Sequence, residues 1–186
     1  MFSAEDVIAL YRHLSAHRIP IWVIGGWGID ALLGKQTRPH KDVDVLMRVD
    51  DVARTRTLLQ RDSYCLKELW SENRWTVDAQ GRKVATAFVL RDAAGREFDA
   101  HAMRLDDQGQ GIPAWAVPEG FVYLKRELAA TGTIGGVEVQ CITPEAQMRC
   151  HADYKLPAKH RRDVELLHAT FNVPYPDGFS SSREHL

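Results

Sequence analysis

The stretch IGGWGIDALLGKQTRPHKDVDVLM, residues 24–47, decides how the chain is expected to fold. Two glycines, Gly25 and Gly26, open the stretch and precede a helix-like run. Gly34 is the natural end of that run, because glycine readily takes the left-handed conformation that follows a helix. Apolar and polar residues then alternate over residues 41–47, which is typical of a half-buried strand.

Two carboxylates interrupt the apolar pattern of this strand. Asp42 and Asp44 are expected to project from one face, because residues two apart in a strand point the same way. Like charges that close repel each other, so one acid would tend to keep its proton. A divalent cation removes the conflict, and Mg²⁺ commonly takes one or two protein carboxylates together with phosphate oxygens and water. The alternative is a solvated polar face on an edge strand.

Two further features favour the metal site over that alternative. Gly25 and Gly26 let the backbone approach a ligand, and the amides at a helix N-terminus favour phosphate, although a glycine pair can also form a simple tight turn. Asp99 lies on a second strand-like run, EFDAHAM, and shares a face with His101. A third acid there could bind a second metal ion or accept a proton from an attacking hydroxyl. Otherwise Asp99 is a surface residue near a hairpin and His101 a packed polar residue.

The rest of the chain reads as a mixture of helices and strands. Helices are expected near residues 3–14, 27–33, 50–61 and 143–154 and after residue 157, and strands at 21–24, 41–47, 65–69, 74–79, 83–92, 96–103 and in a hairpin at 132–142. This order predicts an α+β fold with a mixed sheet flanked by helices. A polar, Gly/Pro-rich segment at residues 104–120 suggests a catalytic domain at residues 1–110, a small, mostly helical region at 111–175 and a mobile tail at 176–186.

The bulk composition narrows the class of protein. The 186 residues carry a formal net charge of -1, so a nucleic-acid partner is not favoured. The three cysteines, Cys65, Cys141 and Cys150, are widely spaced and form no CxxC motif, which argues against a disulfide scaffold or a zinc site. No signal peptide and no apolar run long enough to span a membrane is visible. We therefore expect a cytoplasmic protein that binds small molecules.

Three blocks of sequence resemble a known family. GGWGIDALLGKQTRPHKDVDV, FDAHAMRLDDQG and CITPEAQMRCHADYKLPAKHRRDVELL are similar to the small lincosamide nucleotidyltransferases, of the polymerase-β-like nucleotidyltransferase superfamily. The 2''-type aminoglycoside nucleotidyltransferases share the GGW, the TR and the DxD but look less similar elsewhere. The resemblance spans residues 19–167, and two positions in the last block, Asp153 and His160, depart from the family pattern.

The resemblance implies Mg²⁺-dependent transfer of a nucleoside monophosphate from ATP, or another nucleoside triphosphate, to a hydroxyl of a lincosamide antibiotic. Asp42, Asp44 and Asp99 would be both the catalytic residues and the ligands of two metal ions, with Asp99 as proton acceptor. The remaining expected site residues are Gly25, Gly26 and Trp27, which would cradle the triphosphate, Arg38, His40 and Lys41, which would neutralise the pyrophosphate, and His101, His151, Tyr154 and Asp163, which would face the substrate. A homodimer with the acceptor near the subunit contact is also implied.

Three other functions stay open at this point. An aminoglycoside is a polycation, and several acids, Asp106, Asp107, Glu119 and Asp153, could line a site for one. A non-catalytic, antitoxin-type module of the same fold often lacks one of the three acids, all of which are present here. A nucleic-acid-directed transferase is disfavoured by the near-neutral charge.

Overall fold

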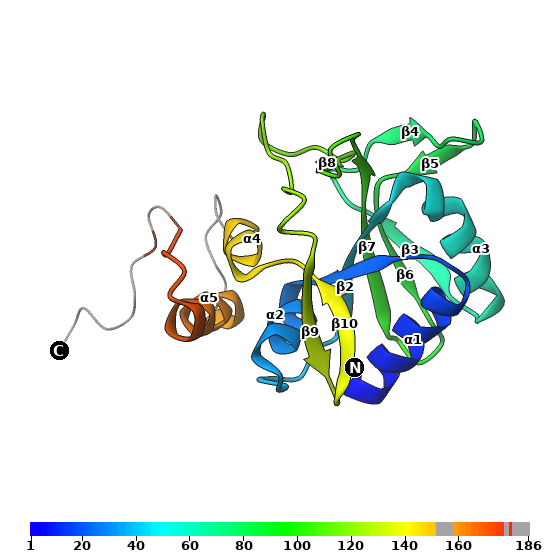
Figure 1. Ribbon diagram of the computed structural model, residues 1–186. Helices are drawn as coiled ribbons and strands as arrows, with labels where there is room; N and C mark the ends of the chain where they lie inside the picture. The colour runs from blue at the N-terminus through cyan, green and yellow to red at the C-terminus, as the bar shows by residue number, and fades with distance from the viewer. Residues whose placement is uncertain (152–157, 177–178, 180–186) are drawn as a thin grey trace.

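The structure is a computed structural model that describes residues 1–151, 158–176 and 179. Most of its strands form one mixed sheet with the order β3-β6-β7-β2-β1-β10-β9, and β8 extends β7 on one side (Figure 1). The strands are β1 (Ile21–Ile24), β2 (Asp42–Arg48), β3 (Cys65–Leu69), β6 (Ala87–Arg91), β7 (Glu97–Leu105), β8 (Gly111–Pro113), β9 (Ala130–Ile134) and β10 (Val137–Cys141). A separate hairpin joins β4 (Trp75–Val77) to β5 (Lys83–Ala85).

Three helices pack on or beside this sheet before residue 62. They are α1 (Ala4–Ala16), α2 (Gly25–Leu33) and α3 (Val52–Arg61), and a short 3-10 turn, Val49–Asp51, precedes α3. The capping box predicted at the start of α1 forms, because Ser3 Oγ accepts from the Asp6 amide at 3.2 Å and the Asp6 carboxylate accepts from the Ser3 amide at 3.0 Å. The left-handed Gly34 ends α2 as predicted.

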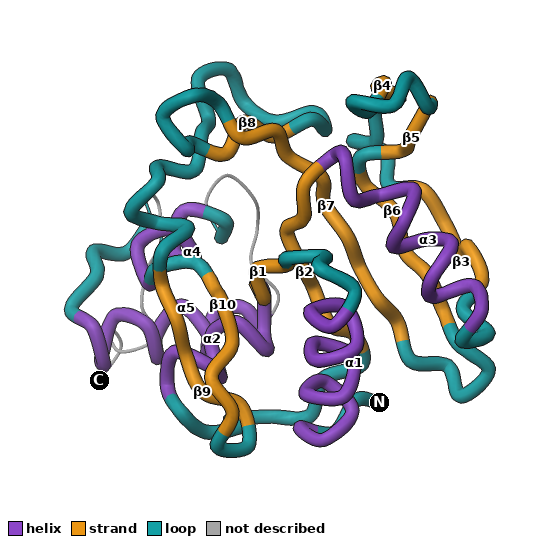
Figure 2. The backbone as a smooth tube through the Cα atoms, turned by 45° about the vertical axis from the view of Figure 1, so that its right-hand side comes forward, coloured by secondary structure: helices purple, strands orange, loops and turns teal. Residues whose placement is uncertain are grey.

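The two faces of the sheet are buried by different partners. Val43, Val45 and Met47 of β2 are fully buried on the face that α1 and α3 cover (Figure 2). Leu46 lies on the opposite face with Asp42 and Asp44 but is buried too, because a second apolar cluster that includes Trp22 and Tyr123 covers that part of the sheet. The face that carries Asp42 and Asp44 is therefore apolar at one end and acidic at the other.

Two helices follow the sheet, the short α4 (Pro144–Arg149) and the longer α5 (Ala158–Phe171). Thr143 caps α4 and Pro144 occupies its first turn, as the sequence predicts. Ile29 of α2 packs in an apolar cluster with residues of both helices, so that α2 lies between the sheet and α5 (Figure 1). The C-terminal helices are thus attached to the helix that begins at the glycine pair.

Some element boundaries differ from the predicted ones. The helix predicted to reach Tyr154 ends at Arg149, and the strand predicted over residues 83–92 is split into β5 and β6 around Thr86, which bonds to the loop before β4 instead. Residues 111–175, expected to be mostly helical, contribute three strands to the main sheet, because β8 pairs with β7 and β10 pairs in parallel with β1. The sheet therefore crosses the predicted domain boundary.

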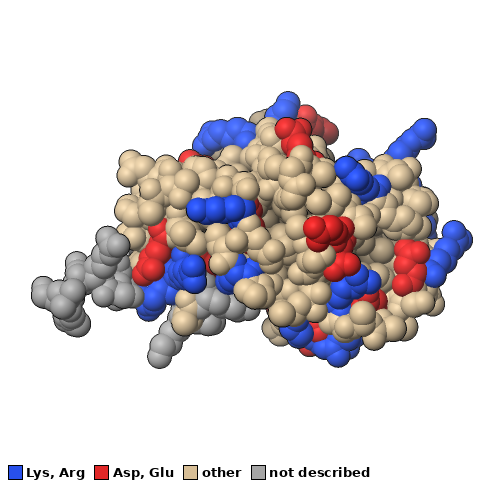
Figure 3. All heavy atoms as spheres, turned by 90° about the horizontal axis from the view of Figure 1, so that it is seen from below, with Lys and Arg blue, Asp and Glu red and all other residues tan. Residues whose placement is uncertain are grey.

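The face of the molecule in Figure 3 carries charges of both signs. In the face drawn in Figure 3, basic and acidic side chains are interspersed. Among the residues that the structure describes, no helix is both long and apolar enough to cross a membrane. Most of the predicted tail, residues 177–178 and 180–186, lies outside the described residues.

Candidate functional site

The predicted acids lie on neighbouring central strands. β2 and β7 run parallel, and their register places Asp44 opposite Asp99 and Asp42 opposite Glu97. Because paired residues of parallel strands point to the same face, the carboxylates of Asp42, Asp44 and Asp99 project from one face of the sheet. Asp99 and the first two acids are more than fifty residues apart in sequence, so only the pairing of β2 with β7 brings them together.

The carboxylate of Asp99 is buried among polar neighbours. Its side chain is buried, its Oδ1 accepts a hydrogen bond from Trp70 Nε1 at 2.8 Å, and His101 Nδ1 lies 3.6 Å from the same oxygen. Burial raises the pKa of Asp99 to about 6, and the nearby Asp42 carboxylate acts in the same direction, while His101 and the Trp70 hydrogen bond oppose the rise. Such a carboxylate is stabilised by a cation, or can accept a proton near neutral pH.

The N-terminus of α2 adjoins Asp44. Ile24, the N-cap residue of the helix, is the register partner of Asp44, and its side chain makes no capping hydrogen bond. Gly25 has φ +59, and a Cβ built on it would lie 2.3 Å from Asp44 Oδ2. The glycine therefore allows the carboxylate to sit directly against the helix start, where the partial positive charge of the amides favours anions.

The donor set fits a hard divalent cation that is completed by a ligand. In the part of the chain that the structure describes, no three His, Cys, Asp or Glu side chains are grouped closely enough to hold a metal ion by themselves. Mg²⁺ does not need such a cage, because it usually takes one or two carboxylates and fills its octahedron with phosphate oxygens and water. The three aligned acids beside an uncapped helix N-terminus match that requirement.

A cluster of charges stands at the start of β2 and β7. Glu97, buried beneath its neighbours, pairs with Arg91, with Lys67 at 3.3 Å and with Lys41 at 3.0 Å. Burial alone would raise the pKa of Glu97, but the hydrogen bonds from these three cations lower it to about 2. Lys41, predicted to meet the pyrophosphate, is largely exposed and already bonded to Glu97. Its role at the site stays a prediction.

A buried polar network connects α5 to the loop that leads into β2. Arg38 makes a two-pronged contact with Asp163 of α5, Nε to Oδ1 at 3.2 Å and Nη2 to Oδ2 at 2.7 Å. His40 lies 3.0 Å from Arg38 Nη1 through Nδ1 and 2.5 Å from Asp30 Oδ2 through Nε2. Thr37 completes the network, since its hydroxyl donates to Asp30 at 2.6 Å. Planar two-pronged pairs of this kind fix geometry as well as charge.

The contacts of this network favour one tautomer of His40. Arginine can only donate, so His40 Nδ1 accepts from Arg38, and its Nε2 carries the hydrogen that goes to Asp30. Both ring nitrogens are then occupied. A Cβ on Gly26 would lie 2.3 Å from His40 Nδ1 and 2.8 Å from Arg38 Nη2, so the second glycine of the pair makes room for the network above the first turn of α2.

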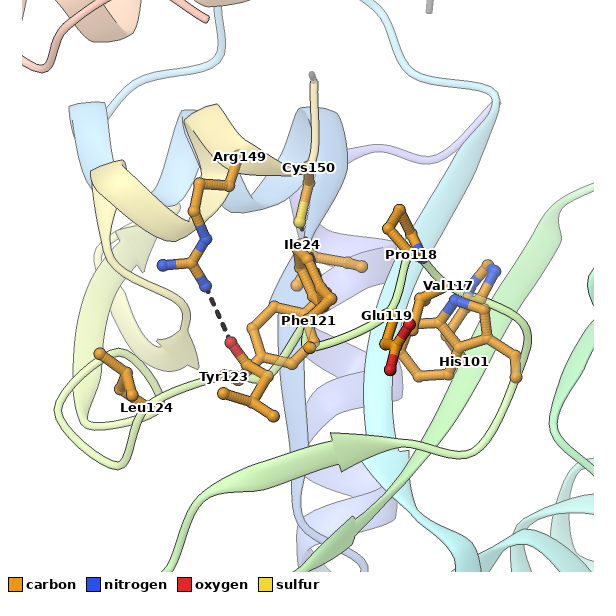
Figure 4. A pocket seen from close by; sticks show the side chains of 13 residues that line it. Ile24, His101, Val117, Pro118, Glu119, Phe121, Tyr123, Leu124, Arg149 and Cys150 are labelled. Atoms are coloured by element: carbon orange, nitrogen blue, oxygen red, sulfur yellow. Dashed lines mark hydrogen bonds between the residues drawn. The ribbon is translucent and has the colours of Figure 1, made fainter. Parts of the chain in front are cut away.

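A cavity of about 830 Å³ opens beside the acids on the same face (Figure 4). Its walls are Trp115 and residues 117–124, with Ile24 from β1, His101 from β7, and Arg149 and Cys150 at the end of α4. Ile24 is the register neighbour of Asp44, and His101 is two residues from Asp99, so the cavity begins where the acidic part of the sheet ends. Its volume suits a drug-sized molecule.

Of the other predicted site residues, some lie at the cavity and others are buried away from it. Trp27 is 1% exposed and packs in the main core, so only its backbone can face a ligand. His151 and Asp163 are both buried away from the cavity lining; His151 Nδ1 lies 2.8 Å from the Gln147 carbonyl, and burial lowers its pKa. His101 lines the cavity, whereas Tyr154 lies outside the described residues.

Sequence reasoning gave no role to several residues that the structure brings to the site. Asp30 is an acid in a nine-residue, otherwise apolar helix, and Glu97 stands two residues before Asp99 on the same face; both patterns are visible in the sequence. In the sequence alone, Trp70 fits a packing residue or a cavity wall. Its bond to Asp99 depends on a contact between distant strands that no local pattern encodes.

Comparisons with known proteins agree with this geometry. Residues 6–167 match the family described as aminoglycoside-2''-adenylyltransferase. A lincosamide resistance protein of Staphylococcus haemolyticus is 25% identical over 162 residues, covering 87% of this chain and 89% of that protein. A 2''-aminoglycoside nucleotidyltransferase of Escherichia coli is 56% identical over 43 residues, which are 22% of this chain and 24% of that one.

Solved structures share the fold. The lincosamide antibiotic adenylyltransferase LnuA, with lincomycin bound, matches with a TM-score of 0.71 at 23% identity and covers 90% of this chain and 97% of its own. ANT(2")-Ia in complex with adenylyl-2"-tobramycin matches with a TM-score of 0.67 at 19% identity, covering 90% of this chain and 88% of its own. At these identities the likeness concerns the fold alone, which is the nucleotidyltransferase fold predicted from the sequence.

Proposed function

Because the chain belongs to the aminoglycoside-2''-adenylyltransferase family, we propose that it transfers a nucleoside monophosphate from ATP, or another nucleoside triphosphate, to a hydroxyl of a lincosamide antibiotic in the cytoplasm. The observation that carries the proposal is the alignment of Asp42, Asp44 and Asp99 on one face, beside a helix N-terminus and at the edge of a drug-sized cavity. A non-catalytic module would not need all three acids in this arrangement.

Each of the site residues has a distinct role in the proposed reaction. Asp42 and Asp44 would hold Mg²⁺ together with phosphate oxygens, and Asp99 would complete the site. Bound Mg²⁺ supplies charge stabilisation for the transferring phosphoryl group, and a second ion would assist the attacking oxygen. The backbone amides of Gly25 and Gly26 orient the triphosphate, while Asp99 accepts the proton of the acceptor hydroxyl.

The chemistry of the cavity favours a lincosamide over a polycation. Its walls are mainly aromatic and aliphatic, and of Asp106, Asp107 and Glu119, the described acids considered for an aminoglycoside, only Glu119 lines it. Asp153 lies outside the described residues. Arg149 stands on the opposite wall (Figure 4). Its charge is paired with Glu127, which lies outside the cavity lining. A lincosamide joins a sugar to an apolar prolyl group, so it matches one polar and one apolar wall better than several separate ammonium groups would.

An aminoglycoside remains the second candidate acceptor, and the 43-residue segment that is 56% identical to the Escherichia coli enzyme supports it. That segment covers 22% of this chain, so it supports this acceptor over only part of the sequence. We also propose the homodimer implied by the family resemblance, which light scattering on the purified protein would test.

The test is an assay of pyrophosphate release with MgATP and either lincomycin or an aminoglycoside such as tobramycin. Lincomycin is expected to support turnover. Asp44→Asn and Asp42→Asn should each lower turnover at least ~100-fold, since charge stabilisation at the phosphoryl group contributes several kcal/mol. Asp107→Asn, at an exposed acid outside the site, should leave turnover unchanged. Circular dichroism confirms that each variant is folded, and near-normal activity of Asp44→Asn would refute the assignment.

A further inference from the structure

A tight turn between β3 and β4 lies over the acids. Its first residue, Trp70, donates its backbone N–H to the Ala87 carbonyl at 3.1 Å. Its last residue, Asn73, accepts through Oδ1 from the amides of Thr86 at 2.8 Å and Ala87 at 3.1 Å. The turn is therefore fixed at both ends to the junction of β5 and β6, and the position of the Trp70 ring is set by the backbone rather than by core packing.

From this turn the Trp70 side chain reaches Asp99. The indole Nε1 donates to Asp99 Oδ1 at 2.8 Å, a normal length for such a bond. The ring is 36% exposed, and it is absent from the buried apolar clusters formed by the described residues. Its most specific interaction is thus a single N–H directed at one oxygen of the acid.

The contacts of Asp99 are uneven between its two oxygens. The Trp70 indole bonds to Oδ1, and His101 Nδ1 lies 3.6 Å from that same atom. Across residues 1–151, 158–176 and 179, no hydrogen bond to Oδ2 is formed. A carboxylate can turn about its last bond, and a donor fixed on one oxygen removes that freedom.

We propose that Trp70 is a positioning residue: its indole N–H holds Oδ1 of Asp99, so that Oδ2 faces the metal ion and the acceptor hydroxyl. The inference rests on the proposed function, in which Asp99 serves the reaction. A reacting group that is held in place before the substrate binds loses less freedom during the reaction, and misplacement by about 1 Å can cost ~100-fold in rate.

The direct test is Trp70→Phe, which keeps an aromatic ring and removes the N–H. Loss of one hydrogen bond to a charged group predicts a roughly 10- to 100-fold fall in kcat, with the KM for lincomycin and the melting temperature little changed. Trp75→Phe is the matched control, because Trp75 is 52% exposed and lies against Lys83 rather than the acids. It should behave as the wild type.

A second measurement does not depend on turnover. The chain has 5 tryptophans, so a ¹⁵N-labelled sample gives a small set of indole N–H resonances, and the one lost in Trp70→Phe identifies Trp70. Addition of Mg²⁺ with a non-hydrolysable ATP analogue should shift that resonance, because the ion changes the charge on Asp99. The Trp75 resonance should stay in place.

The outcomes distinguish failure of the proposed function from failure of the positioning role of Trp70. Absence of wild-type turnover on every antibiotic would refute the proposed function, while the resonance would still report whether Trp70 senses the ion. An active wild type with Trp70→Phe within about twofold of its kcat would overturn the positioning role. So would an equal fall of kcat in both tryptophan variants. If Trp70→Phe fails to fold, the Trp70 resonance is identified by elimination, from the spectra of the phenylalanine variants of the other four tryptophans. A Trp70 resonance that does not shift with Mg²⁺ and nucleotide in the wild type then overturns the positioning role.

Discussion

Replacement of Gly25 by alanine tests whether the glycine pair serves the acids or only the turn. Gly25 has φ +59, and the added Cβ would lie 2.3 Å from Asp44 Oδ2. Contacts of Cβ atoms below 3.0 Å essentially do not occur, so the carboxylate must retreat by about 0.7 Å at least. A shift of this size at a metal ligand predicts a fall in kcat/KM of roughly 100-fold.

Gly34, at the other end of the same helix, separates this effect from backbone strain. It has φ +68, and a Cβ added there would meet nothing within 4 Å. Alanine in the left-handed region costs about 1–2 kcal/mol, partly offset by the lower entropy of the unfolded chain. Both variants should therefore lose a similar few degrees of melting temperature, while Gly34→Ala keeps its activity.

The assay is pyrophosphate release from MgATP and lincomycin, measured beside thermal unfolding of both variants. The two variants are expected to have similar melting temperatures, but only Gly25→Ala should lose activity. Equal activity of Gly25→Ala and Gly34→Ala would refute the reasoning, because it would mean that the position of the Asp44 carboxylate against the helix start has no part in the reaction.

Two further predictions concern stability. Asp163→Asn leaves the guanidinium of Arg38 without its charged partner, so the free energy of unfolding should fall by about 3–5 kcal/mol. The control Arg162→Gln, at an exposed position one residue earlier, should change it by less than about 0.5 kcal/mol. Urea unfolding measures both values, and equal effects would contradict the role of the network. Glu97 has a pKa of about 2 in the folded chain and an ordinary value of 4.5, so it stabilises the fold above pH 4.5 and loses about 3 kcal/mol of that contribution as the pH falls towards 2. Urea unfolding of Glu97→Gln across this pH range should show a flatter dependence than the wild type, and parallel curves would show that its three cationic partners do not lower the pKa as described.

Much of the fold follows from local patterns in the sequence. The cap at Ser3, the left-handed stop at Gly34 and the alternation along β2 each depend on residues a few positions apart, so they can be read without a structure. The pairing of β1 with β10 could not be read in this way, because it joins segments more than a hundred residues apart. The hairpin at residues 132–142 was predicted, but the boundary near residue 110 placed it apart from the sheet to which this pairing joins it.

At the site, local sequence patterns identify the chemistry: they show which carboxylates share a strand face and which glycines lie at a helix start that favours an anion. The partners of these residues follow from the tertiary fold. Pairing of β2 with β7 set Asp99 beside Asp44, the turn before β4 brought Trp70 to Asp99, and α5 brought Asp163 to Arg38. The physical reason is that side-chain direction is fixed by local periodicity, whereas contact between distant segments depends on how the whole core packs.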